Sequence, residues 1–486
     1  MQLYVILLVL GIVAHDTFAE ALPLVELGRI ELLAWFVLPK LALALAYAWM
    51  CRRTLNRLAD GRAAAALDRV EKATGLYRPL IVLLYFTDLA LGALTVLRNA
   101  LSSAIGAKSV IFIDELLILL PPLVLISWAW WAYYPIDRRM REATLMRRID
   151  EGLPMHRIWT RAEYLVSQIR HQIALLLVPL LALLAWSEAV EVLMPIFFGK
   201  SNLALRPTMQ MAGAGCIFLF APVMIRHLWD TIPLPEGELR DRLSQMCSQH
   251  GVAVRELLLW RTFGGLINAA VMGLVRPLRF ILLTDALLEQ LPMIHVEAVM
   301  AHELGHVRRR HTFWLVATAA GLLVCLFASW FEMVSWSWHQ LPAVGLTPPP
   351  GLERSVVDGT AIVLAIAFWL LGFGWISRRF ERQADTFAVQ HMAAEDVAGA
   401  NDGADVRVSD AHVSPMVGAL QRVAHLNHMH PAKRSWRHGS IAWRQSYLRS
   451  LVGRSVGDLP IDRQVRSIKL VTLVAIAAAL SIHLWG

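Results

Sequence analysis

The segment Val299-Met300-Ala301-His302-Glu303-Leu304-Gly305-His306 decides the fold and the chemistry expected of this chain. On a helix, His302 and His306 are four residues apart, so both imidazoles lie on one face and can bind one tetrahedral metal ion. Glu303 lies beside them, where it can take a proton from a water molecule that zinc activates. The pattern predicts one Zn²⁺ per chain and hydrolysis of peptide bonds. The alternative is a chance match, so the rest of the sequence has to support it.

The composition places this motif in a membrane protein. Of the 486 residues, 57% are hydrophobic and only 17% are charged, which is too apolar for an ordinary soluble protein. The net charge of +8 is carried by arginines that fall between apolar runs, as membrane topology requires, so no nucleic-acid partner is expected. The four cysteines lack the spacing of metal ligands. The expected surroundings are a lipid bilayer.

Nine apolar segments approach or reach the length that crosses a bilayer. The expected fold is therefore mainly α, a polytopic transmembrane helix bundle with about nine spans. The segments are residues 3–19, 32–50, 80–97, 110–134, 173–186, 209–228, 312–334, 356–376 and 470–485.

The distribution of arginine orients this bundle. Connections 52–78 and 138–170 are crowded with Arg, whereas the alternate connections carry little positive charge. Positively charged loops stay in the cytoplasm, so alternation also places residues 226–311 and 377–469 there. The metal helix is then expected at the cytoplasmic face. Arg greatly outnumbers Lys, a bias typical of GC-rich bacterial genomes, which favours a bacterial inner membrane.

The residues before the metal helix have the pattern of a small cytoplasmic α+β module of the zincin type. A turn at 235–237 precedes helical spacing over 238–250, and 252–260 and 279–284 are predicted strands. Thr284-Asp285 is the expected N-cap of the helix that leads to His302. An exposed strand edge beside such a helix can bind an extended peptide, so a peptide or membrane protein is the expected substrate.

A third zinc ligand is expected directly after the eighth apolar segment. Glu381 and Asp385 are four residues apart on one predicted helical face. Glu381 can complete a His₂Glu site while Asp385 orients one of the histidines. The alternative is a helix end whose carboxylates pair with neighbouring arginines. Residues 312–376 form a predicted transmembrane hairpin that returns the chain to the same membrane face, and this favours the metal site.

These expectations divide the chain into five parts. They are an N-terminal bundle of six spans at 1–230, a catalytic module at 231–311, the hairpin at 312–376, a second catalytic half at 377–468 and a C-terminal helix at 469–486.

The order of these motifs resembles an integral-membrane zinc metallopeptidase family. His302-Glu303-Leu304-Gly305-His306, followed after two spans by Glu381 and Asp385, is similar to the family that includes the type I CAAX prenyl protease and the bacterial heat-shock membrane protease. The resemblance covers about 233–385 and extends more weakly to 441. It implies that Glu381 is the third zinc ligand and that Asp385 supports the zinc histidines. It also places Asn268 beside the substrate strand, as a candidate peptide contact.

The same resemblance suggests a role for His438. A later histidine of the family helps to bind the scissile carbonyl and is commonly followed by proline, whereas Gly439 follows His438 here. The alternative is a solvated histidine in a basic loop. The bundle also departs from the family pattern, because six spans precede the metal helix where the eukaryotic CAAX protease has five.

The sequence thus predicts a zinc-dependent integral-membrane endopeptidase with Glu303 as general base and His438 as a second oxyanion donor. Quality control of membrane proteins or processing of membrane-associated peptides is the expected role. Two alternatives stay open, a non-enzymatic membrane scaffold and a signal transducer with a zincin-like module. An intact Glu303 argues against a purely structural metal site, which needs no general base.

Overall fold

The computed structural model divides the chain into two compact units, Met1–Asp230 and Thr231–Gly486, each described here by itself. The structure describes residues 2–17, 25–59, 63–105, 113–150, 152, 155, 157–198, 205–263, 265–344, 357, 360–361, 363–364, 367–399, 406–427 and 429–485.

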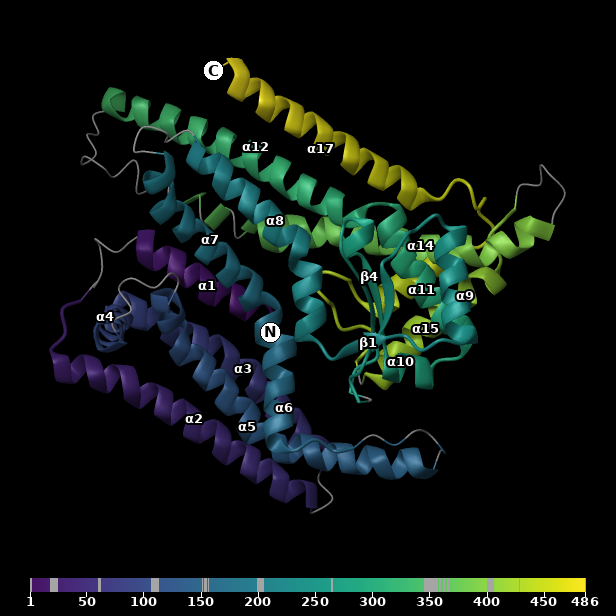
Figure 1. Ribbon diagram of the computed structural model, residues 1–486, viewed down its shortest axis with the longest axis horizontal. Helices are drawn as coiled ribbons and strands as arrows, with labels where there is room; N and C mark the ends of the chain where they lie inside the picture. The colour runs from purple at the N-terminus through teal and green to yellow at the C-terminus, as the bar shows by residue number, and fades with distance from the viewer. Residues whose placement is uncertain are drawn as a thin grey trace. The chain divides into compact units, whose positions relative to one another are not determined.

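The described part of the first unit is helical (Figure 1). Long apolar runs without β-branched alternation favour helices, because a helix satisfies its backbone hydrogen bonds within one segment. The elements are α1 (Gln2–Thr17), α2 (Arg29–Ala59), α3 (Ala63–Ala90), α4 (Ala93–Ile105), α5 (Ile113–Asp150), α6 (Arg161–Gln168), the π-helical turn η3 (Ile169–Ala174), α7 (Leu175–Phe198) and α8 (Leu205–Leu228).

Five helices in the described part of the chain are long and apolar enough to cross a membrane. A sixth candidate is the pair Ala65–Ala90 and Ala93–Leu101, which is bent by 78°. The expected segment 3–19 corresponds to the short helix α1, and residues 356, 358–359, 362 and 365–366 of the expected segment 356–376 lie outside the described residues. The integral-membrane character is therefore supported, and the count of nine spans stays a prediction. The five are Arg29–Leu58, Leu116–Ala143, Arg161–Phe197, Leu205–Leu228 and His311–Gln340.

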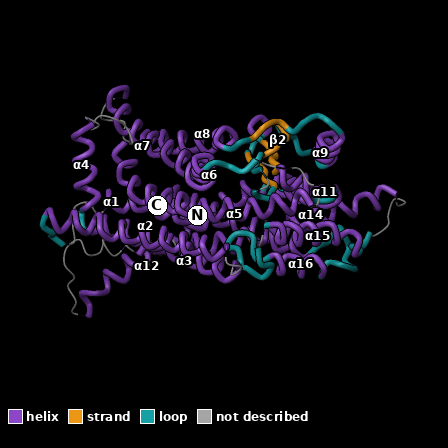
Figure 2. The backbone as a smooth tube through the Cα atoms, turned by 90° about the horizontal axis from the view of Figure 1, so that it is seen from below, coloured by secondary structure: helices purple, strands orange, loops and turns teal. Residues whose placement is uncertain are grey.

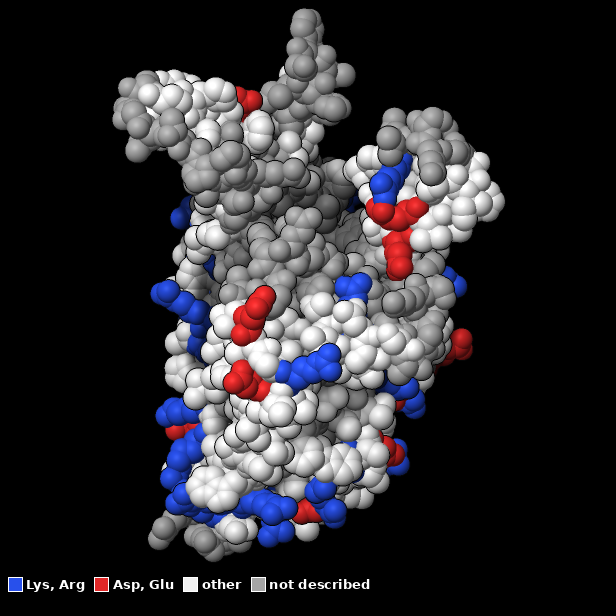
Figure 3. Space-filling model, turned by 90° about the vertical axis from the view of Figure 1, so that its left-hand side faces the viewer, with Lys and Arg blue, Asp and Glu red and all other residues white. Residues whose placement is uncertain are grey.

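Helix α2 presents large apolar side chains to its surroundings. Ile30, Leu33, Leu38 and Trp49 have exposed fractions between 60% and 85%. On the face drawn in Figure 3, uncharged residues make up most of the described surface, while Lys and Arg gather towards its lower end. Exposed apolar side chains in this number are unfavourable in water and favourable in lipid.

A buried ion pair joins two helices of the first unit. Lys40 of α2 donates to Asp88 of α3, with Nζ 2.9 Å from Oδ1 and 2.7 Å from Oδ2. Asp88 is 1% exposed. A charge in an apolar bundle needs such a partner, because an isolated one is costly to remove from water. This pair holds α2 against α3.

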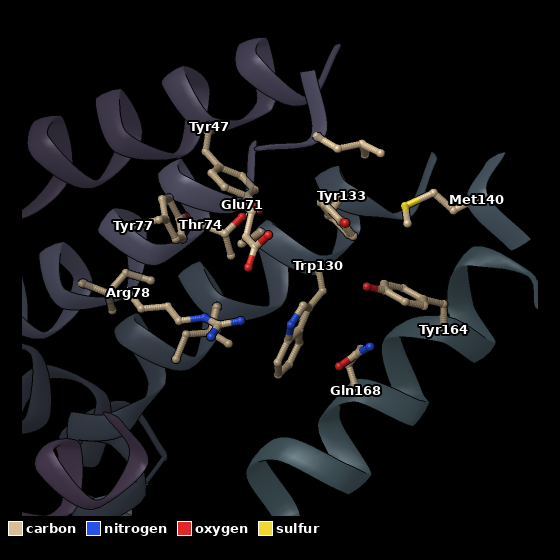
Figure 4. Close-up of a pocket in the computed structure, with 14 residues that line it drawn as sticks. Tyr47, Glu71, Thr74, Tyr77, Arg78, Trp130, Tyr133, Met140, Tyr164 and Gln168 are labelled. Atoms are coloured by element: carbon tan, nitrogen blue, oxygen red, sulfur yellow. The ribbon is translucent and has the colours of Figure 1, made fainter. Parts of the chain in front are cut away.

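A pocket of about 330 Å³ lies among α2, α3, α5 and α6 of the same unit. Figure 4 shows Tyr47, Trp130 and Tyr164 around this space, with Glu71 and Arg78 as its charged groups. The pocket is thus aromatic with a few polar groups, and it belongs to the unit that lacks the metal motif.

The second unit combines a small sheet with helices (Figure 1). The elements before the metal motif are β1 (Thr231–Pro233), α9 (Glu238–Gln249), β2 (Glu256–Trp260), β3 (Ala269–Met272), η4 (Arg276–Leu278), β4 (Phe280–Thr284) and α10 (Asp285–Gln290). Those that follow are α11 (Met293–Arg308), α12 (His311–Gln340), η5 (Leu341–Val344), η6 (Trp369–Phe373), α14 (Gly374–Gly399), α15 (Asp410–Leu426), α16 (Ile441–Arg449) and α17 (Pro460–Trp485).

The sheet has the strand order β1-β2-β4-β3. β2 and β4 are parallel, whereas β1 and β3 are antiparallel edge strands. Every residue of β4 is buried, as expected for a continuous apolar run covered on both faces. The structure contains both predicted strands, and the sequence analysis missed the two short edge strands.

The metal helix does not run on from Thr284-Asp285 as expected. Thr284 caps the short helix α10, with its hydroxyl accepting from the Leu287 N–H. Pro292 then separates α10 from α11, because proline offers no N–H and disfavours a helical residue before it. Figure 1 and Figure 2 both show α11, α14 and α15 side by side. This packing brings the two halves of the predicted site together.

Candidate metal centre

The structure brings His302, His306 and Glu381 together at the contact of α11 and α14. The Nε2 atoms of the two histidines are 3.2 Å apart. Oxygens of the Glu381 carboxylate lie 3.7 Å from His302 Nε2 and 3.8 Å from His306 Nε2. A tetrahedral zinc ion with bonds of about 2.0–2.1 Å spaces its ligand atoms by roughly 3.3 Å, so two histidine nitrogens and the carboxylate group of Glu381, which offers one ligand atom within 4.8 Å of both, can hold zinc. His₂Glu is also a donor set of catalytic zinc sites.

Gly305 allows the two helices to approach this closely. A Cβ atom at position 305 would lie 3.0 Å from Cβ of Phe387 and 3.2 Å from Cα of Ala384. The second distance is to backbone, which cannot move away as a flexible side chain can. The glycine inside the metal motif therefore sets the separation of α11 and α14, and with it the distance from the histidines to Glu381.

Asp385 lies behind His302, as the sequence predicted for one of the two histidines. Its Oδ1 is 3.0 Å from His302 Nδ1. Arg444, on α16, donates to both oxygens of the same carboxylate, at 2.8 Å from Nε and 2.5 Å from Nη2. Arg444 is itself buried, and the sequence analysis missed it. We call His302, Asp385 and Arg444 the charged support.

The pKa values of the charged support follow from these contacts. Burial alone would raise the pKa of Asp385, but Arg444 and His302 together hold it below its usual range. Burial would lower the pKa of His302, and Asp385 reverses the direction. Asp385 therefore stays a carboxylate that can accept from His302 Nδ1–H, which leaves Nε2 to bind a metal.

His306 has a different environment. Its Nδ1 lies 2.9 Å from Nδ1 of His311, the first residue of α12. His311 Nε2 lies 2.9 Å from Oε1 of Gln383 on α14. Burial lowers the pKa of His306 well below its usual value and that of His311 to about 4, so both imidazoles are neutral near pH 7. The sequence analysis did not assign a role to His311 or Gln383.

We call His302, His306 and Glu381 the metal group. Glu303 lies between this group and the edge of the sheet. One of its oxygens accepts from the N–H of Val271 in β3, at 3.1 Å. Burial raises the pKa of Glu303, which suits a group that has to accept a proton and release it again. The only sequence signal for this contact was the expectation of an exposed strand edge beside the metal helix.

His438 reaches the same group from the loop before α16. Its Nδ1 is 2.9 Å from Oε1 of Glu381, and its side chain is 51% exposed. Burial would raise the pKa of Glu381, but the nearby His438, His306 and Arg444 hold it well below its usual value. The structure thus places His438 at the metal group, while its predicted role as an oxyanion donor stays a prediction.

Asn268 lies immediately before β3. Its backbone N–H donates to the Thr284 hydroxyl and its carbonyl accepts from the Thr284 N–H. Among the described residues the Asn268 side chain makes no hydrogen bond, and it is exposed. Its backbone fixes the start of the edge strand, and a contact with substrate stays a prediction.

The same part of the chain matches a known family. Residues 233–438 match the model of peptidase family M48. We call these residues the M48 segment. The M48 segment contains every residue predicted for the site, whereas Arg444 lies beyond it.

Two curated relatives are similar to part of the chain. The CAAX prenyl protease 1 homolog of Arabidopsis thaliana is 28% identical over 212 residues, which is 43% of this chain and 49% of the relative. The CAAX prenyl protease 1 homolog of Oryza sativa subsp. japonica is 28% identical over 171 residues, 34% of this chain and 40% of the relative. The chain thus spans about half or less of the length of these relatives.

A solved structure is a more distant match. The crystal structure of S. mikatae Ste24p aligns with a TM-score of 0.40 and 15% identity, over 85% of this chain and 98% of that one.

Proposed function

We propose that this chain is a zinc-dependent integral-membrane endopeptidase with its site at the cytoplasmic membrane face. One observation carries the proposal: three donor atoms at zinc-ligand spacing lie beside a carboxyl group of raised pKa and an edge strand. His302, His306 and Glu381 would hold one Zn²⁺. A structural metal site has no use for the general base and the strand edge.

The chain's own residues would then act as follows. β3 pairs with β4 along one edge, and its other edge can accept an extended peptide as an added strand. Glu303, held by the Val271 N–H, takes a proton from water and passes it to the leaving amine. His438 donates to the oxyanion of the scissile carbonyl. Zinc, when bound, would supply a Lewis acid for that carbonyl.

The location and the role are inferred from the chain's charge pattern and from its relatives. The arginine-rich connections favour a cytoplasmic site, and the excess of Arg over Lys favours a bacterial inner membrane. The relatives are named as CAAX prenyl proteases, which are peptidases. In a bacterium, quality control of membrane proteins or processing of membrane-associated peptides would provide the substrate.

The test is Glu303→Gln in the full chain, reconstituted in lipid. The amide cannot take a proton, so we expect loss of cleavage by at least ~10²-fold, with about one zinc still bound per chain. Metal analysis and fragment mapping by mass spectrometry of membrane-protein substrates measure the two quantities. Glu238→Gln, an exposed glutamate at the start of α9, is the matched control and should cleave as the wild type does.

The outcomes separate this proposal from its alternatives. Full cleavage by the Glu303→Gln variant would refute the assigned mechanism. A wild-type chain that binds zinc and cleaves no substrate would instead favour the scaffold or the signal transducer.

A further inference from the structure

A chain of hydrogen-bonding groups leads from His306 to the C-terminal helix. The distances are 2.9 Å from His306 Nδ1 to His311 Nδ1, 2.9 Å from His311 Nε2 to Gln383 Oε1, and 2.5 Å from Gln383 Nε2 to Asp462 Oδ1. Asp462 lies in the first turn of α17. The groups come from four elements, and Asp462 lies beyond the M48 segment.

The direction of each hydrogen bond follows from Asp462. A carboxylate only accepts, so the amide nitrogen of Gln383 must face it and the amide oxygen must face His311. His311 Nε2 therefore carries the hydrogen. In a neutral imidazole the other nitrogen is an acceptor, so His311 Nδ1 accepts from His306 Nδ1–H. His306 Nε2 is then left with a lone pair.

The reverse order would oppose metal binding. With the amide of Gln383 turned over, its NH₂ group would face His311 and its oxygen would face the Asp462 carboxylate at 2.5 Å. His311 would then donate from Nδ1, and His306 would carry its hydrogen on Nε2. That hydrogen would point to His302 Nε2, 3.2 Å away, in the space between the proposed ligands.

We propose that Gln383 and Asp462 are positioning residues that hold His306 in the tautomer whose Nε2 binds metal. α17 thereby takes part in metal binding although it carries no ligand. This inference rests on the proposed function, because it assumes that His306 is a metal ligand.

The surroundings hold each group of the chain in place. The ring of Phe380 stacks on His311, with centroids 4.8 Å apart and planes inclined by 5°. Arg309, at the end of α11, has Nη2 3.6 Å from Asp462 Oδ1. α17 is tied to α12 by a 2.8 Å hydrogen bond between the hydroxyls of Thr318 and Thr472. A residue that hydrogen-bonds to a metal ligand can orient it only when the residue is itself held in place.

The direct test removes one link at a time. Gln383→Leu and Asp462→Leu each remove one hydrogen-bonding group of the series that leads to His306. Both substitutions leave all three proposed ligands in place. Zinc affinity of the full chain in lipid nanodiscs, measured by competition with a chromophoric chelator, should fall roughly tenfold for Gln383→Leu. The fall for Asp462→Leu should be smaller, since His311 would still have its acceptor.

The double variant Gln383→Glu/Asp462→Asn distinguishes hydrogen-bond order from packing. Glu at 383 accepts from His311 Nε2–H with one oxygen, and the Asn amide at 462 donates to the other. The donor and acceptor directions of the hydrogen bonds that lead to His306 are thus preserved, while the negative charge moves from residue 462 to residue 383. Zinc affinity should be close to that of the wild type, and the Co²⁺-loaded variant should keep the wild-type absorption bands.

Asp458→Leu is the matched control. Asp458 precedes α17 and pairs with the exposed Arg463, outside the chain of groups, so its loss should leave zinc affinity unchanged. Wild-type affinity in both leucine variants at 383 and 462 would overturn the inference. So would a double variant that folds but binds zinc as weakly as Gln383→Leu. A wild-type chain that binds no zinc would refute the proposed function itself, so the two failures are distinguishable.

Discussion

The two histidines of the metal motif are one helical turn apart, and their supports differ in kind. His302 is backed by the charged support, in which Asp385 is fully buried and held by Arg444. His306 is backed by the neutral imidazole of His311 and the amide of Gln383, which we call the neutral support, and a charge appears only beyond them, at Asp462. Two histidines with the same proposed role are therefore oriented by two different kinds of hydrogen-bond partner.

The difference shows what each support can do. A carboxylate next to an imidazole raises its basicity and fixes its tautomer through one contact. A series of neutral hydrogen-bonding groups adds no charge beside the metal group. It fixes the tautomer of the histidine only if every group in the series is held in one orientation. The charged support should therefore dominate stability, while the neutral support should affect metal affinity alone.

Removal of the carboxylate should have the largest effect. Asp385→Leu takes from the buried Arg444 guanidinium the carboxylate to which it donates, and leaves Glu381 3.6 Å away. An uncompensated buried charge costs about 3–5 kcal/mol. Because Glu381 stays near Arg444, we expect the free energy of unfolding to fall by an amount near the lower end of this range. Zinc affinity should fall by ~10- to 100-fold. Chemical unfolding of the zinc-free chain and chelator competition measure these effects.

The double variant Asp385→Leu/Arg444→Met separates the two contributions. Without the guanidinium the buried charge is gone, so most of the stability should return. Zinc affinity should stay low, because His302 still lacks its acceptor. If stability and affinity recovered together, the comparison between a charged and a neutral support would fail.

A change at Gly305 should disturb both supports at once. Gly305→Ala places a methyl group against the backbone of α14, so the helices have to separate by a few tenths of an ångström. Overpacking of this kind costs about 1–3 kcal/mol. Zinc affinity should fall with stability. Gly75→Ala in α3, where a Cβ would meet nothing within 4 Å, is the control and should not destabilise. Equal behaviour of both variants would contradict the role given to Gly305.

The sequence analysis found what local spacing encodes. The i, i+4 pairs His302/His306 and Glu381/Asp385 pointed to three proposed ligands and one supporting carboxylate, and the structure brings these four residues together. It missed Arg444, 59 residues after Asp385, and Asp462, 79 residues after Gln383. An isolated arginine or aspartate on a distant helix has no periodic signal. Only the packing of α14 against α16 and α17 brings these residues to the site.

The histidine that supports His306 illustrates the same limit. His311 follows the motif by five residues, a spacing that does not share a continuous helical face with His306. Arg310, at φ +56°, breaks the helix between them and turns His311 back towards His306. A run of arginines at 308–310 carries no signal for such a break. A left-handed residue thus creates the neutral support.

The smallest expected effect concerns the start of α16, which carries Arg444. The Ser440 hydroxyl caps this helix by accepting from the Trp443 N–H at 3.2 Å. Ser440→Ala should cost about 1 kcal/mol, the usual value of an N-cap, and should let Arg444 move relative to Asp385. Thermal unfolding should therefore show a small shift together with a weakened affinity for zinc. Thr160→Ala removes an N-cap of the same kind from α6. It should lower stability alike and leave zinc affinity unchanged, because α6 belongs to the unit without the metal group. If Ser440→Ala and Thr160→Ala lowered zinc affinity equally, the affinity would depend on the stability of the whole protein and not on the charged support.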